Sequence, residues 1–419
     1  MEDVLLRKFF EPDRWSSAIR IAVRKGIDRS LLRDLCSPDV RIGLYRRIRD
    51  GQYEVAPPHE AQIPKDDGTM RTVYVNEPMD RVLLSIANDL LFELCPEFVH
   101  PTCGSYQKGI GCADLVKTMS RRLAGIRRED PGRKIDLSKY FDSVARSDID
   151  AVFDNVEAKL GASALISMIR KYYHMDIVLD MKKKPVEKYS SLRQGCAVAA
   201  FLADAVLYDV DAAMSAMGME YCRYSDDILL LGEHWDPAFD RLSDMLSEKG
   251  LKLNPKKIEY LEHDRWFSFL GFSMKKSLVS LSPNRIASFQ SEIDRRTVNS
   301  SRTNVASLVQ AVEQYMYVGN GEYAWATGVL PVVNVEKDLD ALNGYVMDAI
   351  RAAHTGHKRI GGIGADRNLP DRLVSRGTGK HVRQNQRVLP AIPGYMTLRC
   401  MRNALWAGRP AYDALAATI

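Results

Sequence analysis

Long apolar runs and paired cysteines are both missing from this chain of 419 residues. No segment approaches the roughly 18 apolar residues that a membrane helix needs. The 7 cysteines are scattered and contain no Cys-x-x-Cys pair, which argues against a zinc ribbon or a disulfide framework. The first residues lack the basic-then-apolar pattern of a secretory leader, so we expect a protein of the reduced cytoplasm.

Excess charge is also small, at +5 overall, but it is unevenly distributed. From Arg351 to Arg409 there are twelve lysines and arginines against two acids, so this tail carries +10 and the rest of the chain −5. Cations neutralise phosphates and aromatic rings stack on unpaired bases, and the tail also holds Tyr395 and Trp406. The tail therefore favours nucleic-acid binding, with a solvated extension as the alternative.

Two adjacent carboxylates stand in Tyr224-Ser225-Asp226-Asp227, between the strand-like residues 221–223 and the apolar residues 228–231. This pattern predicts a tight hairpin with the acids at its tip. Neighbouring like charges need a counter-cation, and a divalent metal is the obvious one. An exposed acidic turn is the alternative interpretation.

A second acidic strand end lies about ninety residues upstream, in residues 133–144. Its pattern predicts a short strand that ends at Asp136 and a turn that carries Phe141 back against it. Strands that bring Asp136 beside Asp226 and Asp227 would build a three-carboxylate site. Such a site holds two Mg²⁺ ions roughly 3.5–4 Å apart and supports in-line attack at phosphorus. A helix N-cap is the alternative role of Asp136.

These segments resemble the ordered motifs of reverse transcriptases. The resemblance spans about residues 60–275. Several motifs in the same order as in the family indicate it more specifically than any single motif does. It is strongest to the bacterial group of intron-type, retron and defence-associated enzymes. The matching segments are residues 63–75 with 80–83, 105–111, 136–144, 192–196 with 201–204, 224–227, 250–257 and 269–272.

The resemblance implies an α+β fold, a right-hand polymerase with fingers, a ferredoxin-like palm and a helical thumb, plus the basic C-terminal extension. The implied boundaries are 1–130 for N-terminal helices and fingers, 131–280 for the palm with an interleaved fingers segment, 281–350 for the thumb and 351–419 for the extension. Local patterns predict a helical first sixty residues, a hairpin over 180–189, and helices over 77–95, 111–125, 148–172, 196–217, 236–250 and most of 283–350.

The resemblance also implies an RNA-directed DNA polymerase, a nucleotidyltransferase that uses two Mg²⁺ ions, with Mn²⁺ as a substitute. The implied metal ligands are Asp136, Leu137, Asp226 and Asp227. Lys257 matches the lysine near the leaving pyrophosphate and is a candidate general acid, with Lys256 as the rival position.

Six further residues are implied to bind substrate. Lys65 and Arg71 would hold the triphosphate, although surface charges on a hairpin are the alternative. Phe141 would lie below the sugar and reject a 2′-hydroxyl, with core packing as its alternative. Gln194 and Gly195 would lie at the forming base pair. Tyr224 would pack beside the primer end, with a strand tyrosine whose hydroxyl is hydrogen-bonded as the alternative.

Departures from the family pattern narrow the group. Ser225 stands where Ala or Met is common, and Asp204 where Asn is common. The retron hallmarks and a Cys-rich endonuclease tail are missing, and the region after the palm leaves little room for an RNase H domain. By elimination we expect the defence-associated or abortive-infection branch and a role in antiphage defence.

The expected partners are an RNA template, in one version a dedicated noncoding RNA, the DNA product and dNTPs, with no membrane. A homo-oligomer or a companion defence protein stays open. The alternatives are template-independent or protein-primed DNA synthesis, RNA-templated RNA synthesis, and a non-catalytic RNA-binding scaffold with a polymerase fold. Phe141 argues against RNA synthesis, and the intact Asp136, Asp226, Asp227, Gln194 and Lys257 argue against a scaffold.

Overall fold

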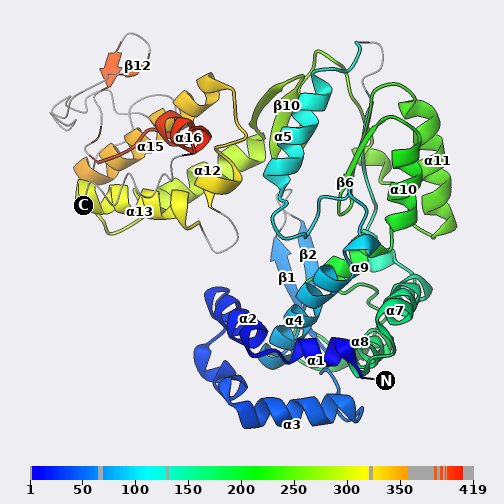
Figure 1. Ribbon diagram of the computed structural model, residues 1–419. Helices are drawn as coiled ribbons and strands as arrows, with labels where there is room; N and C mark the ends of the chain where they lie inside the picture. The colour runs from blue at the N-terminus through cyan, green and yellow to red at the C-terminus, as the bar shows by residue number, and fades with distance from the viewer. Residues whose placement is uncertain are drawn as a thin grey trace. The chain divides into compact units, whose positions relative to one another are not determined.

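The chain divides into two compact units (Figure 1). The computed structural model describes residues 2–64, 69–128, 132–319, 324–356, 382–384, 387–389, 392 and 394–408. Unit 1 holds residues 1–111 and 126–263, and unit 2 holds residues 112–125 and 264–419. In the described ranges, no helix is both long enough and apolar enough to cross a membrane.

Unit 1 begins with helices, as the sequence predicts. Pro12 and Pro38 occupy the first turns of α2 and α3, where a missing N–H costs nothing. The aromatic side chains of Phe9 and Trp15 anchor this region, because both are fully buried and pack edge to face. The elements are α1 (Val4–Phe9), α2 (Pro12–Arg24), η1 (Arg29–Leu32), η2 (Asp34–Cys36) and α3 (Pro38–Arg49).

A four-stranded sheet follows in the order β2-β1-β4-β5. Its strands are β1 (His59–Pro64), β2 (Met70–Val75), β4 (Ile177–Leu179) and β5 (Pro185–Glu187). β1 pairs antiparallel with β2 and parallel with β4. The predicted hairpin over 180–189 is present, but its first strand begins earlier, at Ile177. The Asp180 carboxylate closes its turn by accepting hydrogen bonds from the backbone N–H groups of Lys182 and Lys184.

A second sheet in unit 1 has the order β6-β7-β3-β8, and all its pairings are antiparallel. Its strands are β3 (Arg133–Asp136), β6 (Glu220–Tyr224), β7 (Asp227–Leu231) and β8 (Glu259–Tyr260). Ile228 to Leu231 are fully buried, which explains their unbroken apolar pattern. Helix α10 packs against β6 and α11 against β7 (Figure 1).

The remaining helices of unit 1 surround a common core. They are α4 (Pro78–Leu94), η3 (Pro96–Phe98), α6 (Tyr140–Ser143), α7 (Arg146–Leu160), α8 (Ala164–His174), α9 (Ala199–Ala205), α10 (Tyr208–Ala216), α11 (Trp235–Glu248) and η4 (Pro255–Lys257). The predictions for α4 and α11 are confirmed within two residues. Every side chain of α9 from Phe201 to Ala205 is buried.

Two predicted helices are each divided into two. The prediction of one continuous helix over 148–172 is wrong. Gly161, with φ +89°, ends α7, and the Ser163 side chain caps α8. The helix predicted over 196–217 breaks at Leu207, whose φ of −102° and ψ of 14° leave the helical region. In both cases the apolar periodicity continues across the break, because both halves pack on the same core.

Unit 2 contains α5 (Cys112–Leu123), a three-stranded sheet and a helical region. The sheet has the order β11-β10-β9, with β9 (Phe267–Phe269), β10 (Phe272–Lys275) and β11 (Leu278–Leu281). The other elements are α12 (Pro283–Arg296), α13 (Val305–Tyr317), α14 (Trp325–Gly328), α15 (Glu336–Thr355), β12 (Val382–Gln384), β13 (Arg387–Leu389) and α16 (Leu398–Trp406). These helices confirm the predicted helical character of 283–350 and of 111–125.

The basic tail is only partly described, and its described side chains are used for packing. Arg351 lies buried 2.9 Å from Asp348, Arg399 pairs with Asp340, and Arg402 lies 3.2 Å from Glu336. Tyr395 was expected to stack on bases, but it is buried and its hydroxyl donates to Asn343. That expectation is wrong for Tyr395, since tertiary packing of α16 on α15 encloses it. The side chains of the other nine tail cations lie outside the described residues.

Candidate active site

The predicted hairpin carries the two adjacent acids at its tip. Strands β6 and β7 pair so that Tyr224 faces Asp227, and Ser225 and Asp226 form the turn. Strand β3 pairs with the other edge of β7, in a register that sets Asp136 directly opposite Asp227. The backbone N–H of Leu137 donates to the carbonyl of Asp226 at 3.1 Å. Three carboxyl-bearing residues therefore meet at one end of the sheet, and Asp136 ends a strand instead of capping a helix.

Ser225 holds this turn in a conformation that non-glycine residues rarely adopt. Its φ is +57°, in the left-handed region, which costs roughly 1–2 kcal/mol for an L-residue. Three groups fix it there. The Ser105 hydroxyl accepts from the Ser225 N–H at 3.0 Å, the Tyr106 hydroxyl donates to the Ser225 Oγ at 3.0 Å, and the Arg223 guanidinium donates to its carbonyl at 3.2 Å. Surrounding hydrogen bonds thus impose a strained turn beside the acids.

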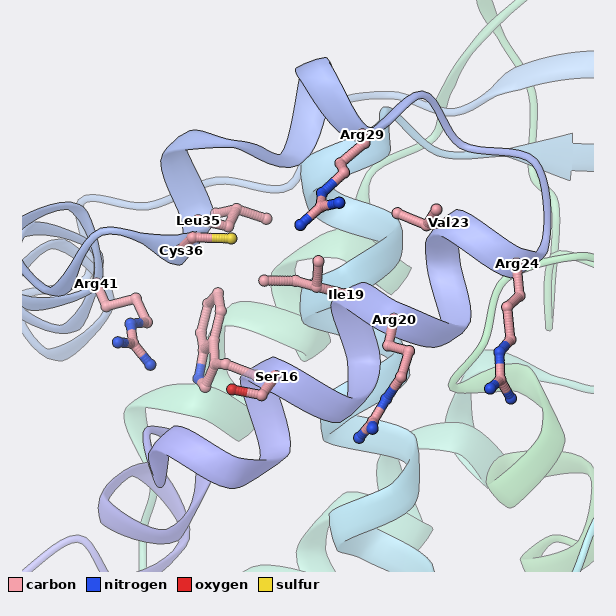
Figure 2. A pocket seen from close by; sticks show the side chains of 10 residues that line it. Ser16, Ile19, Arg20, Val23, Arg24, Arg29, Leu35, Cys36 and Arg41 are labelled. Atoms are coloured by element: carbon pink, nitrogen blue, oxygen red, sulfur yellow. The ribbon is translucent and has the colours of Figure 1, made fainter.

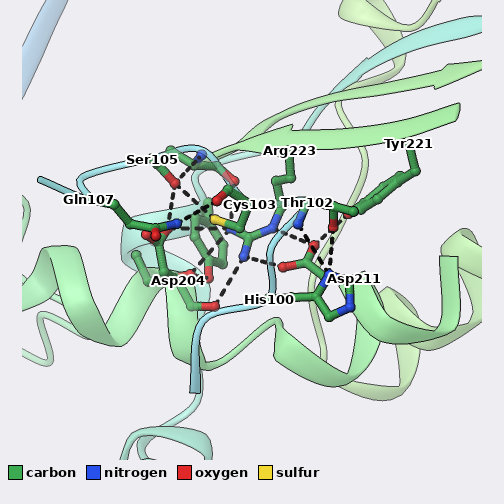
Figure 3. Close-up of polar contacts among 12 residues, drawn as sticks. His100, Thr102, Cys103, Ser105, Gln107, Asp204, Asp211, Tyr221 and Arg223 are labelled. Atoms are coloured by element: carbon green, nitrogen blue, oxygen red, sulfur yellow. Dashed lines mark hydrogen bonds and ion pairs between the residues drawn. The ribbon is translucent and has the colours of Figure 1, made fainter. Parts of the chain in front are cut away.

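The Arg223 side chain belongs to a fully buried ionic network beneath this turn (Figure 3). It binds Asp211 through two hydrogen bonds of 2.8 and 2.6 Å, and it donates to the carbonyl of Asp204 at 3.0 Å. Tyr221 also donates to Asp211, at 2.6 Å. Burial opposes the charge on Arg223, but Asp211 outweighs it and keeps the arginine pKa well above its usual value. Arg223 is therefore charged and links α10, α9 and the turn.

The segment 102–105 runs beside β6 and completes the support. Arg223 donates its backbone N–H to Thr102, and Gly104 donates its own to the Arg223 carbonyl at 2.9 Å. The Ser105 hydroxyl then donates to the Asp204 carboxylate at 2.5 Å. Burial raises the pKa of the Asp204 carboxyl to about 6, against the opposing effect of Arg223. One hydroxyl, that of Ser105, thus contacts both the network and the turn.

The acids at the hairpin tip repel one another. Burial, followed by the charge of Asp226, raises the pKa of Asp227 to about 6. Burial and the charge of Asp136 also raise the pKa of Asp226. A nearby divalent cation would relieve this repulsion.

Lys257 supplies a positive charge to the same place. Its Nζ donates to the Asp136 carboxylate at 2.7 Å, and the Asn254 amide reaches the other oxygen at 3.3 Å. Burial lowers the pKa of Lys257, but the hydrogen bond to Asp136 and the charges of the three acids outweigh it, so its pKa is raised. The ammonium is therefore protonated at neutral pH. The contact with Asp136 is made by Lys257, the residue preferred over Lys256 from the sequence.

Of the two predicted triphosphate ligands, Arg71 is described and Lys65 lies outside the described residues. Arg71 stands on β2 with an exposed side chain, opposite Ile63. Its positive charge acts on Asp226 and lowers that pKa slightly against the larger effect of burial. Arg71 and the carboxylates are thus close enough to interact electrostatically.

The predicted sugar and base contacts lie on adjoining segments. Phe141 is half-buried in α6, packs edge to face on Tyr140, and accepts a backbone hydrogen bond from Leu192 at 3.1 Å. The carbonyl of Gln194 accepts from the N–H of Tyr74 on β2 at 2.7 Å. Gly195 has a φ of +105°, and a Cβ there would lie 2.8 Å from the Tyr74 carbonyl. Only glycine fits this close approach between β2 and the loop.

Tyr224 and Leu137 border the acids. Tyr224 ends β6, is half-buried, and its ring centroid lies 6.2 Å from that of Tyr106. Leu137 is buried, and its side chain cannot coordinate a cation, so a ligand role belongs to its backbone carbonyl. The structure thus brings together Asp136, Leu137, Asp226, Asp227 and Lys257, with Arg71 acting on them through its charge.

Residues 63–274 match the family described as reverse transcriptase (RNA-dependent DNA polymerase). The chain belongs to the reverse transcriptase family. A solved structure that resembles it is telomerase from Candida albicans in complex with a fragment of telomeric RNA, at 10% sequence identity and a TM-score of 0.41. That likeness covers 73% of this chain and 60% of the telomerase chain. No curated protein matches the chain in sequence.

Reverse transcriptase domains generally use divalent metal ions, and the donor set of this one suits them. Asp136, Asp226 and Asp227 offer the carboxylate oxygens that Mg²⁺ prefers, and burial together with the charge of a neighbouring acid raises the pKa of Asp226 and of Asp227. Across the described ranges, however, no three His, Cys, Asp or Glu side chains are already gathered into a metal-binding cluster. Here the Asp136 carboxylate is instead bound by Lys257 and Asn254.

Sequence reasoning missed the residues that hold the site of this reverse transcriptase in place. Arg223 and Asp211 were not singled out, and Asp204 was noted only as a departure from Asn. A signal was present, since a charged residue interrupts the apolar pattern of a strand directly before the acidic turn. An arginine in such a place calls for a buried acidic partner, but the partner itself is only found in three dimensions.

Proposed function

We propose that this member of the reverse transcriptase family catalyses RNA-directed DNA synthesis from dNTPs. The observation that carries the proposal is the β3–β7 register, which sets Asp136 opposite Asp227 with Asp226 in the adjoining turn and Lys257 against Asp136. This arrangement suits a nucleotidyltransferase, because carboxylates from separate strands lie at one end of the sheet beside a protonated amine.

The proposed fold is a right hand. The β6-β7-β3-β8 sheet would be the palm, the β2-β1-β4-β5 sheet part of the fingers, and helices α12 to α15 the thumb. The proposed boundaries stay at 1–130, 131–280, 281–350 and 351–419, the last being the basic extension.

Asp136, the Leu137 carbonyl, Asp226 and Asp227 would hold two Mg²⁺ ions, or Mn²⁺ in their place. Ions bound there would stabilise charge on the attacking and leaving oxygens of an in-line displacement. Arg71, with Lys65, would bind the triphosphate through charge and hydrogen bonds. The Lys257 Nζ is protonated and would neutralise the leaving pyrophosphate and give it a proton.

The other residues would select and orient. Phe141 would leave no room for a 2′-hydroxyl, and Gln194 with Gly195 would border the forming base pair, where the close backbone approach to Tyr74 keeps the loop in register with β2. Tyr224 would pack beside the primer end. These assignments rest on the resemblance together with the positions described above.

We further propose a cytoplasmic enzyme of the bacterial defence-associated or abortive-infection branch, acting in antiphage defence. Its partners would be an RNA template, in one version a dedicated noncoding RNA, the DNA product and dNTPs. A companion defence protein or a second copy of the chain is compatible with this role. The branch is supported by elimination, because the retron hallmark motifs are missing from the sequence.

The test of the catalytic proposal is incorporation of dNTPs on a primed RNA template with Mg²⁺ or Mn²⁺. Asp226→Ala and Asp227→Ala should each abolish incorporation while the thermal unfolding temperature falls little, since each removes an acid under electrostatic strain. Asp240→Ala, an exposed acid on α11, is the matched control and should leave incorporation unchanged. Undiminished synthesis by both tip variants would contradict the assignment.

Sequencing of the nucleic acid that co-purifies from the native host separates the remaining activities. A DNA complementary to one abundant RNA would support templated synthesis from a dedicated RNA. Untemplated DNA attached to a tyrosine would indicate the protein-primed alternative. RNA without any DNA product, together with an inactive purified chain, would indicate a scaffold.

A further inference from the structure

A pocket of about 550 Å³ lies in the N-terminal helices of unit 1, on elements that contribute nothing to the carboxylate site. Four arginines line it, Arg20 and Arg24 from α2, Arg29 from η1 and Arg41 from α3. No acidic residue lines it. Its apolar lining includes Ile19 and Leu35.

Arginines from three elements lie around the pocket, and their side chains do not all point the same way (Figure 2). Arg29 extends from η1 toward Ile19, and Arg41 reaches in from α3. Arg20 and Arg24 leave α2 in the same direction, as residues four apart on a helix do. Together they border an apolar surface with positive charge.

The positive charge in this pocket is not compensated within the described part of the chain. No described acid forms an ion pair with any of the four arginines, and the one side-chain hydrogen bond among them runs from Arg20 to Ser17. Two acids close in sequence have other partners, since Glu11 pairs with Arg14 and the Asp28 side chain accepts from the Ser30 N–H. An anion in the pocket would be attracted by this positive charge.

We propose that this pocket binds a nucleoside phosphate, with its phosphate on the arginines and its base or sugar against the apolar side chains. Arginine binds phosphate oxygens bidentately and stacks on base planes, and the half-buried Ile19 and Val23 offer an apolar surface to the ring. The fully buried Trp15, whose indole N–H donates to the Phe9 carbonyl, supports the pocket from below and does not stack on the ligand.

Two sources supply this chemistry to a polymerase, a nucleotide within a single strand and a free nucleotide. The pocket is separate from the proposed catalytic residues, so the proposal does not depend on their roles. A primed-template incorporation assay therefore reports on the proposed function, and a binding assay reports on the pocket.

The experiment compares the intact chain with the variant R20Q/R24Q/R29Q/R41Q. The matched control is R121Q/R127Q/R241Q/R302Q, which removes the same charge from four exposed arginines outside the pocket. The probes are a fluorescent single-stranded RNA of about 12 nucleotides, within the usual range of binding-site sizes, and radiolabelled ATP. Binding of each is titrated against salt.

If the ligand is part of a strand, the pocket variant should lose RNA affinity at least about tenfold and its log–log salt slope should fall by up to about 3 units, from about 0.7 per phosphate contact. If the ligand is a free nucleotide, ATP binding should be lost and RNA binding kept. Equal losses in the pocket and control variants, or no loss of either probe, would overturn the proposal.

Alkylation of Cys36 measures directly whether a probe occupies the pocket. It lines the pocket, its thiol is exposed, and it can be alkylated with a maleimide and quantified by mass spectrometry. The bound probe should slow alkylation of Cys36 in the intact chain and in the control variant, but not in the pocket variant. Alkylation that the probe leaves unchanged in the intact chain would place the ligand elsewhere and refute the inference.

Discussion

Arg223→Met tests whether the buried network positions the acidic turn. Arg223 is fully buried and makes two hydrogen bonds to the Asp211 carboxylate and one each to the carbonyls of Asp204 and Ser225. Removing it leaves Asp211 as a buried charge without a cation, which costs about 3–5 kcal/mol. The turn also loses one of the three groups that hold Ser225 at a φ of +57°.

Two measurements separate stability from positioning. Urea unfolding followed by circular dichroism should show the loss of about 3–5 kcal/mol. The double variant R223M/D211N removes the stranded charge and keeps an acceptor for Tyr221, so it should recover about 2 kcal/mol or more of this loss. Incorporation of dNTPs should stay low in both variants, by about a hundredfold if the turn shifts by about 1 Å.

The control is Arg170→Met. Arg170 pairs with Asp150, Asp154 and Glu157 at the surface, so its loss should cost about 1 kcal/mol or less and leave incorporation unchanged. Equal unfolding midpoints for Arg223→Met and the intact chain would refute the energetic reasoning. Full activity in R223M/D211N would refute the positioning role, because the arginine would then serve stability alone.

Two further predictions concern single side chains. Phe141→Ala should raise the use of rNTPs relative to dNTPs by about a hundredfold. The control is Phe153→Ala, which removes a fully buried core side chain of α7 and should destabilise the chain without changing this ratio. Equal ratios in the two variants would make Phe141 a packing residue. Asp204→Asn concerns pH. Burial raises the pKa of Asp204 in the folded chain to about 6, beside Arg223, Asp211 and Cys103. The free energy of unfolding of the intact chain should therefore fall by up to about 3 kcal/mol as pH rises from about 4 to about 6, because the folded state then loses a proton that it binds more tightly than the unfolded state does. Urea unfolding of the Asn variant should show a smaller loss over that range.

Much of the site could be predicted because its signals are local. Asp226 and Asp227 lie at the tip of a predicted hairpin, and Asp136 ends a predicted short strand. The one further inference was that β3 pairs with β7 and so brings these acids together. The resemblance favours Lys257 over Lys256, and the Lys257 Nζ lies 2.7 Å from the Asp136 carboxylate.

The rest could not be predicted because it depends on residues far apart in the chain. The partners of Arg223 come from α9 and α10, and Ser105 reaches the turn from a segment about 120 residues earlier. Helix breaks at Gly161 and Leu207 were missed because apolar periodicity continues across both. In the first case Gly161 marks the end of one helix and Ser163 the start of the next, but the prediction of a single helix followed the apolar periodicity instead.

The order of strands in the β6-β7-β3-β8 sheet affects how the protein is made. β3 is synthesised first, but both of its neighbours come later in the chain, so its two edges stay open for about ninety residues of translation, or about 5–20 s at usual rates. An open strand edge is a template for wrong pairing, and a nascent chain in this interval should depend on chaperones. The carboxylates meet only after β7 has left the ribosome, so a nascent chain that ends before β7 lacks the three-acid arrangement.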